Sequence, residues 1–179
     1  MNQNDSEMKH PEFRPFNIEQ LKNIPRETVV KLVLLLVLAL FLAAVYARTY
    51  AKDVSLKDVD TRLVKETDCE KYQVQTARQL YQFLELNAQD YEEVLYRKST
   101  ETMSADELLI VKAKSGEDLD AVQDAVEERI RSQISVFEGY GPTQTARLKN
   151  ALIYKKGRYL FYCVAKNPEK YEEVFRRAL

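Results

Sequence analysis

A run of apolar residues near the N-terminus is the strongest pattern in the chain. From Leu32 to Ala47 no residue is charged, and Thr28 to Val30 extend the run upstream, with Lys31 as its one charged interruption. A helix of ~20 residues rises ~30 Å, which matches the hydrocarbon core of a bilayer. We therefore predict a transmembrane helix over residues 28–47 that places the protein in the lipid bilayer.

The fate of this segment has two open interpretations. A lipoprotein anchor is excluded, because no cysteine precedes Cys69. A cleaved signal peptide stays open, since the small residue Ala47 ends the run. Residues 1–27 make a long leader, however, and this favours an uncleaved anchor. Basic residues flank both sides about equally, but a folded domain behind the first segment favours a cytoplasmic N-terminus. We predict a single-pass protein of the cell membrane with an extracytoplasmic C-terminal domain.

The flanks of the apolar run differ in character. Residues 1–27 are polar, contain three prolines and show no sustained period, which predicts a disordered cytoplasmic tail. Residues 48–70 predict a juxtamembrane segment, in which 51–65 form a helix that stands the domain off the bilayer. Residues 71–179 remain for the soluble domain.

Two periodicities divide this domain into helices and strands. Helical spacing of apolar residues predicts helices over 71–87, 115–137, 142–149 and 168–178. Runs rich in β-branched and aromatic residues predict strands over 93–99, 108–114, 151–155 and 159–165, the last two joined as a hairpin. The fold class is α+β: a two-layer domain of about four strands with helices on one face, preceded by the transmembrane helix.

Composition and charge exclude one class of partner. Apolar residues make up 45% and charged residues 31%, as in ordinary globular proteins. The 27 basic and 28 acidic residues nearly balance, whereas binding to nucleic acid normally needs a surplus of Lys and Arg. We therefore expect no nucleic-acid partner. Cys69 and Cys163 lack the spacing of a metal site, and a disulfide between them stays open if the domain is extracytoplasmic.

No set of residues predicts catalysis, a cofactor or a metal site. The one histidine, His10, lies in the tail. Ser104, Asp106 and Glu107 bring together a hydroxyl and two carboxylates, but no base can be named to activate the serine. A local cap and turn that lead into the next strand explain these three residues better than a hydrolase site does. A small hydrolase that uses two carboxylates is the last of the functions we consider.

The corner Glu138-Gly139-Tyr140-Gly141-Pro142 is the candidate for contact with a ligand or partner. Its two glycines permit a positive φ or a close approach of another molecule, and Tyr140 offers a ring and a hydroxyl. The structural alternative is a helix-to-helix corner, in which glycine ends one helix and proline begins the next.

Three motifs carry a resemblance to a known family: Met103-Ser104-Ala105-Asp106-Glu107, Phe137-Glu138-Gly139-Tyr140-Gly141-Pro142, and Lys156-Gly157-Arg158-Tyr159. Over residues 55–178 the chain resembles the domain of unknown function family 4358 of Gram-positive bacteria. The resemblance implies export, either as a lipoprotein or behind one membrane helix. It implies no activity and no catalytic residue.

These observations together predict a non-catalytic accessory or interaction protein of the bacterial cell envelope, with an envelope protein or wall component as its partner. The alternative is a sensor domain that binds a glycan or lipid ligand at the corner of residues 138–142.

Overall fold

A computed structural model of the protein describes residues 25–49, 51–114 and 119–179. The chain divides into two compact units, residues 1–45 and 46–179. The first contains most of helix α1 (Arg26–Thr49). Over Arg26–Tyr46 this helix is long and apolar enough to cross a membrane, a test that a signal sequence also meets. Residues 1–24 of the predicted tail lie outside the described residues, and Arg26 and Glu27 belong to α1.

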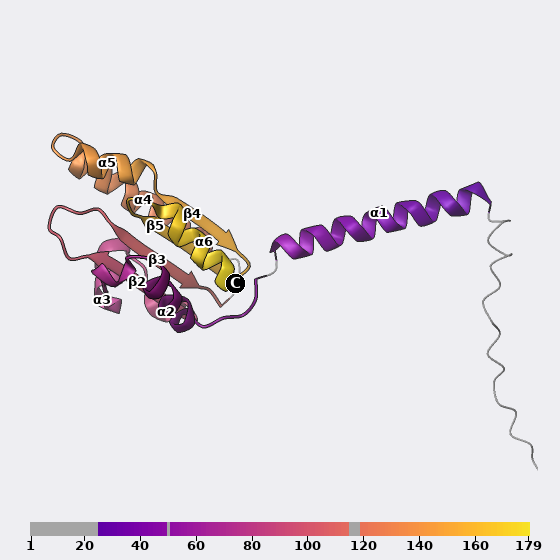
Figure 1. The fold of residues 1–179 in the computed structure, drawn as a ribbon, viewed down its shortest axis with the longest axis horizontal. Helices are drawn as coiled ribbons and strands as arrows, with labels where there is room; N and C mark the ends of the chain where they lie inside the picture. The colour runs from indigo at the N-terminus through magenta and orange to yellow at the C-terminus, as the bar shows by residue number, and fades with distance from the viewer. Residues whose placement is uncertain (1–24, 50, 115–118) are drawn as a thin grey trace, which may run out of the picture. The chain divides into compact units, whose positions relative to one another are not determined.

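The second unit is built on one antiparallel sheet in the order β1-β2-β3-β5-β4 (Figure 1). The strands are β1 (Tyr72–Val74), β2 (Glu93–Ser99), β3 (Glu107–Lys112), β4 (Leu152–Lys156) and β5 (Tyr159–Val164). The helices are α2 (Leu56–Glu66), α3 (Ala77–Leu84), α4 (Leu119–Phe137), α5 (Pro142–Lys149) and α6 (Pro168–Ala178). The predicted α+β class is confirmed.

The helices cover both faces of the sheet, and the prediction of helices on one face was wrong. Alternate residues of β3 enter two separate cores. Leu109 and Val111 pack with α3, α4 and α5, whereas Leu108 and Ile110 pack with α2 and α6. Every residue of β3 and of β5 is buried, so each face of these central strands requires a helical layer.

Two boundaries also differ from the predictions. The α2 part of the predicted juxtamembrane segment belongs to the folded domain, because Leu56, Val59 and Leu63 are buried against the sheet. The predicted helix 71–87 is shorter, since Thr76 caps α3 through a capping box with Gln79. The residues ahead of this cap form β1, a fifth strand that pairs with β2.

A buried carboxylate lies between the sheet and α4. The Glu107 side chain is fully buried and accepts hydrogen bonds from the hydroxyls of Tyr96 and Tyr162, each at 2.8 Å. Arg129 of α4 donates to both of its oxygens at 3.2 Å. An ionised group without these partners would cost several kcal/mol to bury. The network therefore fixes α4 over β2, β3 and β5.

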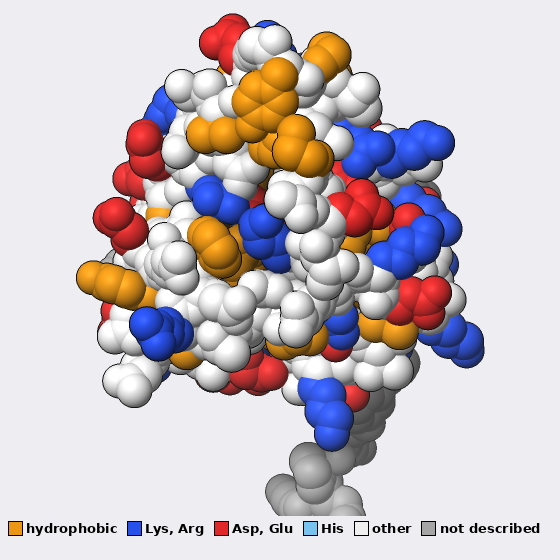
Figure 2. Space-filling model, turned by 90° about the vertical axis from the view of Figure 1, so that its left-hand side faces the viewer, with side chains coloured by type: hydrophobic (Ala, Val, Ile, Leu, Met, Phe, Trp, Pro, Cys, Tyr) orange, Lys and Arg blue, Asp and Glu red, His pale blue; other side chains and the backbone are white. Residues whose placement is uncertain are grey.

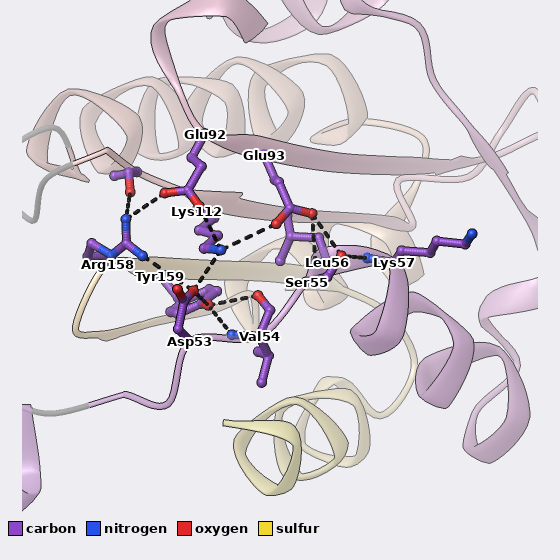
Figure 3. A network of polar contacts seen from close by, with 11 residues as sticks. Asp53, Val54, Ser55, Leu56, Lys57, Glu92, Glu93, Lys112, Arg158 and Tyr159 are labelled. Atoms are coloured by element: carbon purple, nitrogen blue, oxygen red, sulfur yellow. Dashed lines mark hydrogen bonds and ion pairs between the residues drawn. The ribbon is translucent and has the colours of Figure 1, made fainter.

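A second polar network holds the segment that follows α1 against the other end of the sheet (Figure 3). The Lys112 ammonium, whose side chain is only 6% exposed, lies 2.7 Å from Asp53, 2.8 Å from Glu92 and 3.4 Å from Glu93. The Tyr159 hydroxyl accepts from the Val54 amide and donates to the Val54 carbonyl, both at 2.8 Å. Residues 53 and 54 are thus part of the folded domain.

We predict that Arg129→Met destabilises the domain by about 3–5 kcal/mol, because the Glu107 carboxylate stays buried without its cation. Arg131→Met is the matched control on the same helix, since Arg131 pairs with Glu128 at the surface. It should cost less than about 1 kcal/mol. Urea unfolding of the full chain in detergent, followed by circular dichroism, measures both. Equal losses would contradict the role given to Glu107.

We predict that acid releases residues 53 and 54 before the central sheet opens. Hydrogen bonding to Lys112 lowers the pKa of Asp53 and of Glu92 below their ordinary values of 3.8 and 4.5. Depressed carboxyl pKa values stabilise the network above the ordinary values, and this contribution disappears as the pH falls through the folded ones. The hydrogen-exchange protection factor of the Val54 amide should therefore fall below about pH 3.8, whereas that of Leu109 should hold. Parallel loss at both amides would refute the prediction.

Candidate functional site

Helix α5 is surrounded by three neighbouring hollows at one end of the domain. The largest is a polar cavity of about 820 Å³ between α5, α6 and the connection that carries Asp68. A second hollow of about 530 Å³ shares Arg147 and Lys166 with this cavity. It also shares Pro142 and Ala146 with a third hollow of about 460 Å³ at the corner after α4. The three hollows adjoin one another through these shared residues, and we call them together the α5 surface.

An ion pair links α5 to the start of β3 in the polar cavity. Nη1 of Arg147 lies 2.8 and 2.7 Å from the two carboxylate oxygens of Asp106. The Tyr72 hydroxyl approaches the same carboxylate at 3.5 Å. Asp106 is mostly buried, so this pair positions α5 and also presents charge to the cavity.

Two stacked tyrosines form the inner wall of the cavity. The rings of Tyr72 and Tyr171 lie 6.2 Å apart with 10° between their planes, and both residues are buried. The Tyr171 hydroxyl donates to Asp68 at 2.6 Å. Because both rings are covered, only their hydroxyl edges can meet a ligand.

Two tyrosines and one carboxyl group of this cavity have shifted pKa values. Burial raises the pKa of Tyr72 and of Tyr171 well above the ordinary range. The hydrogen bond from Tyr171 lowers the pKa of Asp68. The tyrosines therefore remain donors and Asp68 remains an acceptor, a state suited to holding a polar molecule rather than to exchanging protons with it.

The predicted corner forms the apolar part of the α5 surface. Its hollow is lined by Phe137, Glu138, Gly139, Tyr140, Pro142, Thr145, Ala146 and Lys149. Tyr140 is 56% exposed and Val136 58% exposed, while the buried Phe137 ring lies 5.7 Å from that of Tyr140. Figure 2 shows hydrophobic side chains gathered at the upper part of this end of the domain, above basic and acidic ones. The structure thus brings the predicted residues to the edge of a real hollow.

The two corner glycines have different roles. The amides of Gly139, Tyr140 and Gly141 all donate to the Phe137 carbonyl, which ends α4. A Cβ on Gly141 would lie 2.8 Å from Cδ1 of Phe137, so this position needs glycine for space. A Cβ on Gly139 would meet nothing within 4 Å, and neither glycine has a positive φ. Close packing at Gly141 therefore fixes the corner.

The three residues weighed for hydrolysis separate into different surroundings. The Ser104 hydroxyl accepts from the Asp106 amide, Asp106 pairs with Arg147, and Glu107 is buried beside Arg129. Sequence analysis missed Arg147 and Tyr171, because they come from helices that are distant in the chain. Across residues 25–49, 51–114 and 119–179, no group of three or more His, Cys, Asp or Glu could hold a metal ion.

Both cysteines are buried free thiols in the core beside α2 and α6. Burial raises the pKa of Cys69 to about 12 and that of Cys163 well above its ordinary value.

We predict that iodoacetamide at pH 8 modifies neither Cys69 nor Cys163 in the native protein, because the thiolate is the reactive form. Both should be modified in urea without a reductant, as mass spectrometry would measure. Labelling that required a reductant would reveal a disulfide instead.

Comparison with known proteins identifies the family. The search of curated proteins and the search of solved structures return no match. The model of the family described as "Domain of unknown function (DUF4358)" matches residues 65–165. This range runs from the end of α2 through β5 and includes Asp106, the corner and Arg147. The chain therefore belongs to the DUF4358 family.

Proposed function

We propose that this protein is a non-catalytic, membrane-anchored accessory protein of the cell envelope that binds its partner through the α5 surface. The observation that carries the proposal is the continuity of this surface. Exposed Tyr140 lies at one end of it, and the ion pair of Asp106 and Arg147 lies at the other. An apolar patch beside polar groups of fixed charge is the usual composition of a protein-binding site.

The chemistry of the cavity supports binding. Its most buried carboxylate, Asp106, is held by a guanidinium, and its buried tyrosines keep their protons. General acid–base catalysis needs a group whose pKa lies near the working pH. The pKa shifts at Tyr72, Tyr171 and Asp68 all lead away from neutrality.

The anchor supports the proposed location. Helix α1 can cross a bilayer by length and composition, and the folded domain begins within a few residues of its end. Family members resemble one another in being exported. On this proposal, residues 28–47 lie in the membrane, and the domain meets an envelope protein or wall component outside the cytoplasm.

We predict that Tyr140→Ala reduces recovery of the partner at least about tenfold, as expected when an interface loses a main aromatic contact. Crosslinked pull-down of the full-length tagged protein from native membranes, followed by mass spectrometry, measures the recovery. Tyr81→Ala is the matched control, because Tyr81 is 62% exposed on α3. Partners retained equally by both variants would refute binding through the α5 surface.

A second candidate is a sensor for a glycan or lipid headgroup, and the 820 Å³ polar cavity favours it. Its hydroxyl and charged edges suit a ligand rich in hydroxyl groups. If the pull-down enriches no protein, calorimetric titration of the full chain with wall glycan fragments and lipid headgroups becomes decisive. Heat of binding that Arg147→Ala abolishes would favour the sensor.

A further inference from the structure

Strand β4 forms an open edge of the sheet. Within the described ranges no strand pairs with it on the side away from β5. All five of its residues are half-buried, in contrast to the fully buried β5. Open edges present unpaired amides and carbonyls that can bind another strand.

The hydrogen bonds of β5 show which groups of β4 point outward. The Ala113 amide donates to the Arg158 carbonyl at 2.8 Å, so Arg158 and every second residue after it in β5 form backbone hydrogen bonds with β3. The backbone groups of successive residues point to opposite sides of a strand. Tyr159 and every second residue after it therefore form backbone hydrogen bonds with β4. Their partners in β4 are Leu152, Tyr154 and Lys156. Ile153 and Lys155 therefore direct their amides and carbonyls away from the sheet.

This edge is complementary to itself in one register. If two β4 strands pair antiparallel about Tyr154, Ile153 lies opposite Lys155 of the second copy, and Leu152 lies opposite Lys156. No lysine then lies directly opposite another lysine, and Tyr154 lies opposite Tyr154 of the second copy. Centring the pair on Lys155 would set like charges directly opposite, which is destabilising. Centring it on Ile153 would leave Lys156 opposite a residue outside the strand.

The side chains also suit a second copy in the register centred on Tyr154. Ile153 packs on the α4 side of the sheet and Tyr154 on the α6 side. Asp120 of α4 already neutralises Lys155 at 2.7 Å. The aliphatic stems of the lysines can cover Ile153 and Leu152 of the other molecule. Each half of the contact repeats the other, as a two-fold interface requires.

We propose that two copies of this chain associate through their β4 strands, in antiparallel register about Tyr154, to form one continuous sheet. The second copy's strand contributes the acceptors and donors that the outward backbone groups of Ile153 and Lys155 lack among the described residues. The inference goes beyond the proposed function, because it needs neither the α5 surface nor its partner.

Disulfide trapping of the full chain in native membranes tests the register. In a non-hydrogen-bonded antiparallel pair, opposite Cα atoms lie about 4.5 Å apart, within reach of a disulfide. Tyr154→Cys should therefore give a covalent dimer under mild oxidation. Lys155→Cys is the control, because its two copies would lie about 8 Å apart, beyond disulfide reach. Wild type controls for Cys69 and Cys163. Equal crosslinking of both variants, or none from a folded Tyr154→Cys, would overturn the proposal.

A second pair of variants tests the backbone contacts without a cysteine. Lys155→Pro removes an outward amide but no bond within the sheet, since proline is tolerated on edge strands. Lys155→Thr keeps that amide and removes the same charge. In sedimentation of the detergent-solubilised full chain, we expect Lys155→Pro to raise the dimer dissociation constant at least about tenfold above that of Lys155→Thr. Equal constants, or a wild-type chain that remains monomeric at all concentrations, would contradict the proposal.

Discussion

A strand whose residues are all buried must be covered on both faces, and this holds for β5 and for its neighbour, the central strand β3. Its side chains enter two cores, so the helices have to divide between the two sides of the sheet. The polar residues at its ends then act as fixed points. Glu107 holds α4 at one end, and Lys112 holds the segment after α1 at the other. Asp106, one residue before β3, holds α5 through Arg147. The segment of residues 53 and 54 and the α5 surface are thus held at opposite ends of one strand.

The sequence predicted those elements whose periodicity is local. The apolar run of α1, the long period of α4 and the hairpin at Gly157 all depend on neighbouring residues, and the α+β class followed from them. Strand β1 was not predicted, because its three residues are too few to show a strand pattern and form a strand only by pairing with β2. The helical layer that α2 and α6 form on the second face of the sheet was not predicted, for a related reason. An apolar face predicts that a helix packs, but not on which side of a sheet.

The candidate site divides in the same way. The corner of residues 138–142 was found because glycine and proline are strong local indicators of a turn. The need for glycine at Gly141 comes from the Phe137 ring and could not be predicted from conformational freedom. The polar cavity could not be predicted from the sequence. It depends on Asp106 meeting Arg147 across 41 positions and on Tyr72 stacking on Tyr171 across 99. Such long-range contacts leave no period to detect.

Our central proposal is that the α5 surface binds a partner while α1 anchors the domain in a membrane. The most direct measurement is site-specific photo-crosslinking of the full chain in native membranes. A benzophenone side chain would replace Tyr140 in one variant and the equally exposed Tyr81 in another. We expect position 140 to capture one defined partner and position 81 to capture none above background. The same products from both positions, or capture from position 81 alone, would contradict the account.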